Sequence, residues 1–311
     1  MRRPGALPYL VLAAGVLITS TASILIRFAQ AEGVPSLSIA AGRLAIAALL
    51  LTPVAWSRAG ADLRRVSRSD LLLAAGSGVF LAIHFATWIS SLAYTSVASS
   101  VALVSTNPLW AGLASLVILR ERLRGGTLAG ILLTLGGTAL ILVSDSGAEA
   151  AARHPAPLLG NLLALIGALA VTGYFLIGRA LRQRLSLLAY IWLVYGTAAL
   201  TLVMTAAATG RPLLGFSPLA WLCIVGLALG PQLLGHSSFN WALRFLSATF
   251  VAVATLGEPV GSALLALAFF GESFAPLQLA GFVLLLAGIY AAARSEQPDA
   301  GSPEEARPAG G

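Results

Sequence analysis

Ten long apolar runs, separated by short polar or charged breaks, dominate this sequence of 311 residues. A transmembrane helix needs about 20 apolar residues, so runs of this length are suited to crossing a bilayer. Charged residues make up 10% of the chain, against about 25% in soluble domains. A soluble globule, a disordered chain and a collagen-like chain are therefore excluded. The predicted spans are residues 7–29, 36–57, 70–92, 96–119, 126–144, 157–181, 187–209, 218–243, 247–270 and 275–293.

The basic residues mark the ends of alternate runs. All 19 are arginine. With the N-terminus placed inside, fifteen fall on the inner side, and Arg27, Arg153 and Arg211 fall on the outer side. This positive-inside bias predicts a multi-pass protein of the cell (inner) membrane with both termini cytoplasmic. The net charge of +7 is explained by topology, so a nucleic-acid partner is not predicted.

The sequence repeats itself at an offset of 151 residues. Pro108 then aligns with Pro259, and Glu121 aligns with Glu272. Matches of proline and glutamate are harder to explain by shared apolar composition than matches of leucine. The two glutamates end corresponding runs, and there they are interpreted as helix-end anchors or salt-bridge partners. The repeat predicts two related halves of five helices each.

Five is an odd number, so the second half must enter the membrane from the opposite side. Secondary transporters use such inverted repeats because one half can rock against the other around a central site. An old duplication without functional consequence is the alternative. The predicted fold class is all-α integral membrane, with ten transmembrane helices as two inverted five-helix repeats. Its parts are a first repeat at 1–145, an outer linker at 146–156, a second repeat at 157–294 and a disordered cytoplasmic tail at 295–311.

Two polar residues at matching positions lie deep in their runs. Glu258 lies about twelve residues into its run, roughly 17 Å along a helix and near the middle of a ~30 Å core. Asn107 is its repeat mate, and Pro108 and Pro259 follow the two residues. Proline lets a helix bend and expose backbone carbonyls to a cavity. Since ionisable groups at membrane depth are costly, Glu258 is predicted to couple transport to protons or to bind substrate. The alternative is a neutral carboxyl with a structural role.

Arg43 is the second ionisable residue at membrane depth, about seven residues from the outer end of its run. It is predicted to face the outer vestibule and bind an anionic group of the substrate through its planar fork. The alternative, equally compatible with the sequence, is an anchor that snorkels to the interface.

Two histidines are approximate repeat mates, His84 in the third run and His236 in the eighth. Trp88 follows His84 by one helical turn and Asn240 follows His236 by one turn, so each pair shares a helix face. The four are predicted to line the pathway. The alternative is that the histidines are hydrogen-bonded packing residues. No third ligand accompanies the two histidines, so neither a metal site nor a cofactor is predicted.

Several short motifs occur in a fixed order along the chain. They are Arg43, the run Ser91–Ala98 leading to Pro108, Glu121-Arg122-Leu123, Asn240-Trp241-Ala242-Leu243, Ser247-Ala248-Thr249, Glu258-Pro259 and Gly271-Glu272. In this order the sequence resembles the EamA-type drug/metabolite transporters over nearly its whole length. The resemblance implies ten helices and transport of small metabolites, often export of amino acids or similar solutes. Two departures are a first run without the tryptophan common in the family, and Ser273 instead of arginine after Glu272.

The leading prediction is a secondary active transporter that works by alternating access. It would export a small metabolite, such as an amino acid or a related amphipathic solute, with protons as the candidate coupling ion. The sequence has no P-loop to support direct drive by ATP. A membrane-embedded enzyme would need a clustered acid, base or metal constellation, which is absent from the sequence. The alternatives are an uptake permease and a passive channel. The expected partners are the substrate, protons and the bilayer, and a monomer is compatible with the sequence.

Overall fold

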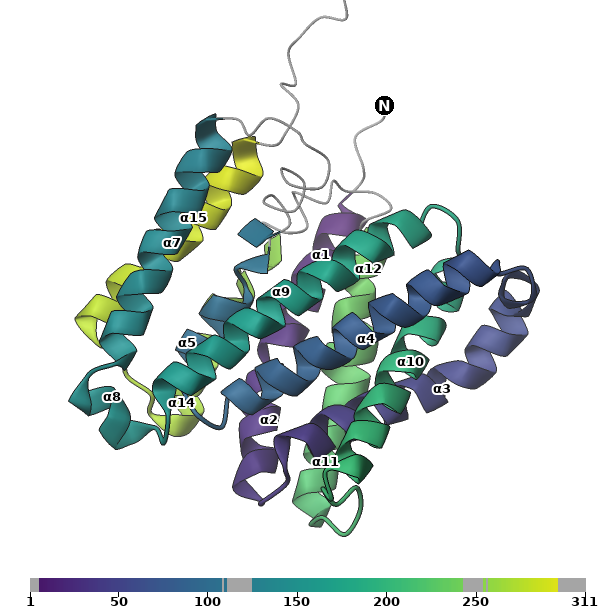
Figure 1. Ribbon diagram of the computed structural model, residues 1–311, viewed down its shortest axis with the longest axis horizontal. Helices are drawn as coiled ribbons and strands as arrows, with labels where there is room; N and C mark the ends of the chain where they lie inside the picture. Colours follow the sequence, from purple (N-terminus) through teal and green to yellow (C-terminus); the bar gives the residue numbers. More distant parts are fainter. Residues whose placement is uncertain (1–5, 108, 111–124, 243–253, 256, 296–311) are drawn as a thin grey trace, which may run out of the picture.

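The computed structural model describes residues 6–107, 109–110, 125–242, 254–255 and 257–295. These residues form helices and no strand (Figure 1). The helices are α1 Leu7–Ser20, α2 Ala22–Ala31, α3 Ser36–Arg64, α4 Arg68–Ser91, α5 Val97–Val104, α7 Gly125–Asp145, α8 Ala148–Arg153, α9 Pro157–Leu181, α10 Leu187–Ala208, α11 Pro218–Leu227, the π-helix η1 Ala228–His236, α12 Ser237–Ala242, α14 Gly257–Phe270 and α15 Pro276–Ser295.

Seven helical stretches of the described part are long and apolar enough to cross a membrane. Two further apolar helices are shorter, Gly257–Phe270 and Pro276–Gly288. Within the predicted span 96–119 the structure describes α5, which has 8 residues, and a few residues beyond it. The all-helical, multi-pass membrane fold is therefore confirmed, whereas the count of ten spans stays a prediction. The predicted tail lies outside the described residues apart from Ser295.

Serine residues set the starts of several helices. Ser67, Ser96, Ser186 and Ser217 precede α4, α5, α10 and α11, and each hydroxyl accepts a hydrogen bond from the backbone N–H three residues later. An N-cap of this kind satisfies a backbone donor that the helix itself cannot pair. These caps fix where the chain leaves each loop and enters the bundle.

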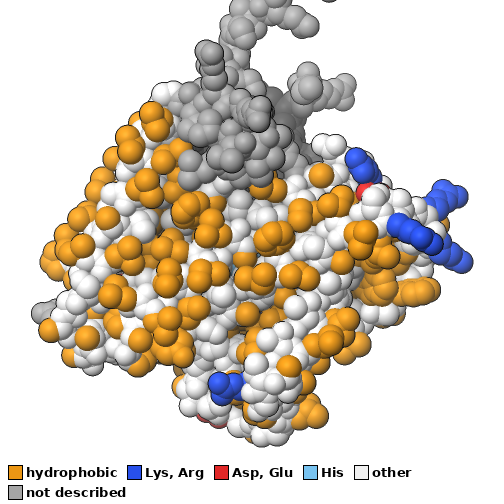
Figure 2. Space-filling view, in the orientation of Figure 1, with side chains coloured by type: hydrophobic (Ala, Val, Ile, Leu, Met, Phe, Trp, Pro, Cys, Tyr) orange, Lys and Arg blue, Asp and Glu red, His pale blue; other side chains and the backbone are white. Residues whose placement is uncertain are grey.

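The bundle has two ends, defined here by the loops they carry. The α8 end holds α8 and the loops between α2 and α3, α10 and α11, and α14 and α15 (Figure 1). The opposite end holds the turn between α3 and α4, where Arg58, Arg64, Arg65 and Arg68 are exposed. Figure 2 shows apolar side chains spread over the helices between the ends and most of the visible basic side chains on the right, with another at the bottom. An apolar girdle of this kind matches the hydrocarbon core of a bilayer.

Helices from the two predicted halves pair with one another. α3 packs on α10 and α7 packs on α15, while α4 packs on α9 and the α1–α2 segment packs on α11, η1 and α12. The α7–α15 contact is close, because a Cβ at Gly137 would lie 2.5 Å from the backbone nitrogen of Leu285. Small residues allow such an approach between membrane helices. The halves are therefore interleaved across one bundle.

Candidate functional site

A cavity of about 70 Å³ lies inside the bundle. Its walls come from α1, α2, α4, α5, α9, η1, α12 and α14, which are far apart in the sequence. Five of the predicted site residues line it, namely His84, Trp88, Asn107, His236 and Glu258. The other lining residues are Thr19, Ala22, Val104, Ser105, Val171, Phe175, Phe239 and Thr255. The structure thus brings most of the predicted polar residues to one place, called the central cavity below.

His84 and Trp88 form the α4 wall of the central cavity. The Nδ1 atom of His84 lies 2.9 Å from the carbonyl oxygen of Gly167 in α9. A carbonyl can only accept, so Nδ1 carries the proton and a neutral ring keeps Nε2 as an acceptor. The Trp88 ring stacks on His84 with 5.8 Å between centroids. The Trp88 Nε1 donor is buried and has no hydrogen-bond partner among the described residues, so it is available to a bound solute.

His236 ends η1 and faces this wall through aromatic rings. It lies edge-on to Phe85 and to Phe239, with 5.9 Å between ring centroids in each case. η1 is a π-helix with Pro231 inside it. π-Helical turns are rare and occur often at functional sites, because they displace side chains from the regular helical register. Here the π-helix delivers His236 to the cavity.

Asn240 does not line the central cavity. Its Nδ2 atom donates to the carbonyl oxygen of His236 at 3.0 Å and to the hydroxyl of Tyr174 at 3.4 Å. Tyr174 in turn stacks on Tyr190. Asn240 therefore supports the wall behind His236, whereas the sequence pattern predicted it to line the pathway itself.

Glu258 is the second residue of α14; Ala254 and Thr255 are helical as well, and residue 256 lies outside the described part. The sequence pattern placed it in the middle of a helix that starts near residue 247; residues 247–253 lie outside the described part. Thr19 of α1 lines the same cavity as Glu258, and its hydroxyl donates to the carbonyl oxygen of Val16 at 3.0 Å. Pro259, predicted to bend the helix, is buried in the same turn.

Asn107 lies beyond the end of α5 rather than inside a continuous helix. α5 ends at Val104, and Ser105 and Thr106 form a turn before Asn107. The Asn107 carbonyl oxygen accepts a hydrogen bond of 3.1 Å from the hydroxyl of Thr172 in α9. The predicted bend residue Pro108 lies outside the described residues. The helical path is thus interrupted beside the cavity.

Arg43 is completely buried and stands behind the central cavity. Its Nε atom donates to Oε1 of Gln232 at 3.0 Å, and its guanidinium carbon lies 4.1 Å from the centre of the Phe85 ring. The terminal nitrogens Nη1 and Nη2 have no hydrogen-bond partner among the described residues. Arg43 therefore lies in the interior beside the cavity, instead of in an outer vestibule or at the interface.

Gln232 is a functional candidate that the sequence reasoning missed. It lies in η1, it is 1% exposed, and it holds the Arg43 guanidinium. The one signal was a proline directly followed by a polar residue within an apolar run. The role of Gln232 becomes clear only from the fold, because its partner Arg43 lies 189 positions away in the sequence.

The central cavity is small for a metabolite. Its volume of about 70 Å³ lies well below the roughly 300 to 1,000 Å³ of small-molecule sites. Its lining combines a carboxyl, two imidazoles, an indole and an amide. Groups of this kind can bind a polar solute or hold a proton, provided that the cavity widens.

A multi-pass helical bundle with polar side chains converging on an internal cavity is typical of membrane transporters. The profile of the EamA-like transporter family matches residues 6–143 and 158–294, so the chain belongs to that family. It is similar to the uncharacterized transporter YetK of Bacillus subtilis (strain 168), with 24% identity over 94% of both chains. An uncharacterized transporter of Archaeoglobus fulgidus is 26% identical over 75% of this chain and 80% of the relative.

The fold also matches a solved crystal structure. That structure superposes with a TM-score of 0.66 and covers 92% of this chain and 96% of its own. The sequence identity is 21%, so the match concerns the fold alone.

Proposed function

We propose that the protein is a secondary transporter that exports a small metabolite by alternating access. The substrate class is an amino acid or a related amphipathic solute, and protons are the coupling ion. The observation that carries the proposal is the convergence of Glu258, His84 and His236 on one cavity within the bundle from three separate elements. Ionisable and titratable groups at membrane depth mark solute and proton pathways.

The helix pairings support an inverted repeat of two five-helix halves, 1–145 and 157–294. Exchanging the halves maps α3 onto α10 and α7 onto α15, and these helices pack on each other. The same exchange maps α4 onto the segment of α11, η1 and α12, and it maps α9 onto the segment of α1 and α2. The α4–α9 contact then corresponds to the contact between these two segments, which also exists. A pseudo-two-fold axis of this kind allows the two halves to rock around the central cavity.

The charge distribution supports an orientation with the α8 end outside. Arg58, Arg64, Arg65 and Arg68 are exposed at the opposite end, and basic residues favour the cytoplasmic side. Both termini are then cytoplasmic, and the membrane is the cell (inner) membrane.

The roles proposed for the site follow from its contacts. Glu258 carries the proton, because it is the carboxyl of the cavity lining. Arg43, with two unpaired terminal nitrogens beside the cavity, provides the positive charge for an anionic group of the solute once the cavity widens. His84 and Trp88 form a flat wall for the rest of the solute.

The test uses inverted membrane vesicles and a labelled solute. A thermal-shift screen of the purified protein against amino acids, amines and dyes selects the solute, because a ligand stabilises the native state that binds it. Glu258→Gln is expected to abolish uptake driven by a pH gradient. The matched control Glu32→Gln removes an exposed carboxylate and is expected to keep it. Wild-type rates and pH dependence in Glu258→Gln would overturn the role of this residue.

A further inference from the structure

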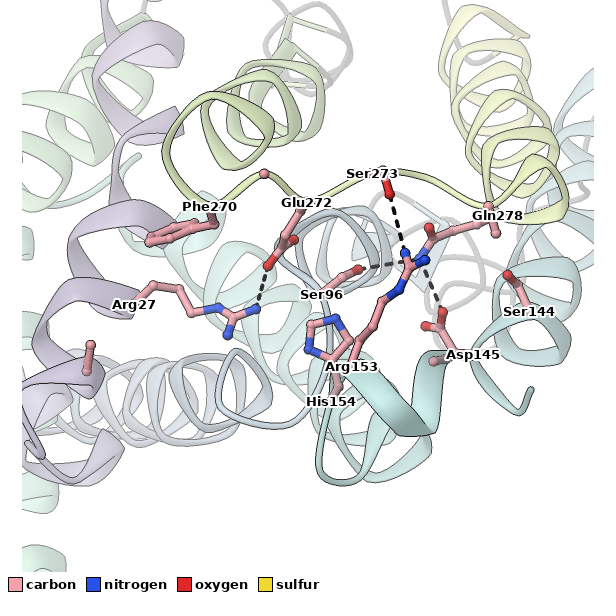
Figure 3. A pocket seen from close by; sticks show the side chains of 14 residues that line it. Arg27, Ser96, Ser144, Asp145, Arg153, His154, Phe270, Glu272, Ser273 and Gln278 are labelled. Atoms are coloured by element: carbon pink, nitrogen blue, oxygen red, sulfur yellow. Dashed lines mark hydrogen bonds and ion pairs between the residues drawn. The ribbon is translucent and has the colours of Figure 1, made fainter. Parts of the chain in front are cut away.

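A second and larger cavity of about 500 Å³ opens at the α8 end (Figure 3). It lies between α2, the ends of α5 and α7, α8 and the loop from α14 to α15. It shares no lining residue with the central cavity among the described residues. Sites for small molecules have volumes of about 300 to 1,000 Å³. This cavity, called the outer pocket below, is therefore large enough for a solute as it stands.

Two of the four charged side chains in the outer pocket neutralise each other. Arg27 Nη2 lies 2.6 Å from Glu272 Oε1. The other carboxylate oxygen, Oε2, accepts a hydrogen bond of 2.9 Å from the backbone N–H of Val97. Arg27 and Glu272 therefore form one wall of the pocket without a net charge.

Asp145 at the end of α7 is a buried carboxylate without a cation. It is 5% exposed. Its Oδ1 atom accepts from Gln278 Nε2 at 3.1 Å, and its Oδ2 atom accepts from Asn161 Nδ2 at 2.7 Å and from the Thr95 hydroxyl at 3.4 Å. These donors are all neutral, and within the described part of the chain no basic group makes a salt bridge to Asp145. Asp145 is thus a carboxylate on the pocket wall that hydrogen bonds stabilise but no salt bridge neutralises.

Arg153 at the end of α8 is the matching cation without an anion. Its Nη1 atom donates to the Ser273 hydroxyl at 3.3 Å. No carboxylate of the described residues lies within salt-bridge distance of it. Burial lowers the pKa of the neighbouring His154 from the usual 6.5, which favours its neutral form. Figure 3 shows Arg153 and Asp145 around the same pocket.

We infer that the outer pocket binds a small amphoteric solute, whose cationic group meets Asp145 and whose anionic group meets Arg153. A solute with both charges compensates both side chains at once, whereas a solute with a single charge leaves one of them unpaired. Charge-assisted hydrogen bonds to a carboxylate and a guanidinium are the stronger polar contacts available to it. The ring of Phe270 and the methyl groups of Ala31, Ala150 and Ala275 provide an apolar wall. The inference concerns binding outside the central cavity and does not require transport.

The test measures protection of a thiol in the pocket of the purified full-length chain. Ala150→Cys places the thiol on α8 without removing a polar contact, in a Cys223→Ala background that has no other cysteine. A water-soluble maleimide labels the thiol in the presence of L-phenylalanine, its methyl ester or its N-acetyl derivative. The ester carries only the cation, and the N-acetyl compound carries only the anion.

L-Phenylalanine is expected to slow labelling, and the two derivatives are not. At about ten times its Kd a solute leaves about one pocket in eleven free, which slows labelling roughly tenfold. Arg153→Gln should abolish the protection. The control Arg211→Gln removes an exposed arginine outside the pocket, at the same end, and should keep it. Three outcomes would overturn the inference: equal protection by all three compounds, no protection by any, or protection that survives Arg153→Gln.

Discussion

Arg27 in α2 and Glu272 in the loop before α15 form an ion pair 245 positions apart in the sequence, with 2.6 Å between Nη2 and Oε1. Gly271 makes this approach possible, since its φ of 65° lies in the region that favours glycine. Arg27 also donates to the carbonyl oxygen of Thr95 at 3.2 Å. The pair therefore joins α2, the start of α5 and the α14–α15 loop at the α8 end.

Neutralising either partner of this pair should lower the thermal midpoint of the protein. The side chains are 22% and 13% exposed, so we expect a coupling energy of about 1 to 2 kcal/mol, between values for exposed and buried pairs. A double-variant cycle with Arg27→Gln and Glu272→Gln measures it by unfolding in detergent. Arg211→Gln is the control for loss of an arginine at this end. Strictly additive effects of the two substitutions would contradict the prediction.

Replacing Gly137 by alanine should destabilise the α7–α15 contact. The added Cβ would lie 2.5 Å from the nitrogen of Leu285 and 2.6 Å from the oxygen of Gly281, both backbone atoms that cannot move aside freely. Overpacking costs about 1 to 3 kcal/mol. Gly136→Ala is the matched control, because no atom lies within 4 Å of its Cβ. We expect a lower thermal midpoint for Gly137→Ala alone, and equal midpoints would refute the close packing.

Loss of the His84 side-chain hydrogen bond should cost stability without removing the ring. His84→Phe keeps an aromatic ring against Trp88 but leaves the buried carbonyl of Gly167 without its 2.9 Å partner. The Gly167 carbonyl keeps its backbone hydrogen bond within α9, so the loss is that of one hydrogen bond, about 0.5 to 1.5 kcal/mol. Thr205→Val, which removes an exposed bond within α10, should have almost no effect. A His84→Phe protein as stable as the wild type would show that this bond contributes nothing.

Arg43 should matter more for solute affinity than for folding. Arg43→Ala removes the positive charge beside the central cavity and leaves Gln232 without its 3.0 Å partner. We expect solute binding to weaken at least about tenfold, equivalent to one charge-assisted hydrogen bond of roughly 1.4 kcal/mol. Arg43→Lys keeps the charge but not the planar fork, so its affinity for the solute should lie between that of the wild type and that of Arg43→Ala. Full affinity in Arg43→Ala, at wild-type expression, would make this residue a structural anchor.

Much of this site was predictable because helical spacing and membrane depth leave few choices. His84 and Trp88 are one turn apart, which placed them on one face, and their rings stack. Glu258 and Asn107 stood out as polar residues in apolar runs, and both line the central cavity. In such cases the spacing along the helix and the depth in the apolar run are enough to predict which residues face the interior.

The remainder depends on contacts between distant segments. The Arg43–Gln232 bond spans 189 positions, and it relies on a π-helix that hydrophobic periodicity cannot reveal. Asn240 shares a helical segment with His236, yet the hydroxyl of Tyr174 in α9 holds it outside the cavity lining. The outer pocket combines Arg153, placed only on the outer side by the sequence, and Glu272, interpreted there as a helix-end residue, with Asp145, which the sequence did not single out. Tertiary packing, rather than local pattern, assembles these groups.

Counterflow tests the central claim most directly, because a carrier that alternates between two faces exchanges solute across the membrane without an energy source. The purified protein is reconstituted in liposomes loaded with the unlabelled solute that the thermal-shift screen selects. Uptake of the labelled solute is then measured with no ion gradient. Alternating access predicts that internal solute accelerates labelled uptake and drives a transient accumulation. Uptake that is indifferent to internal solute would contradict alternating access and indicate a channel.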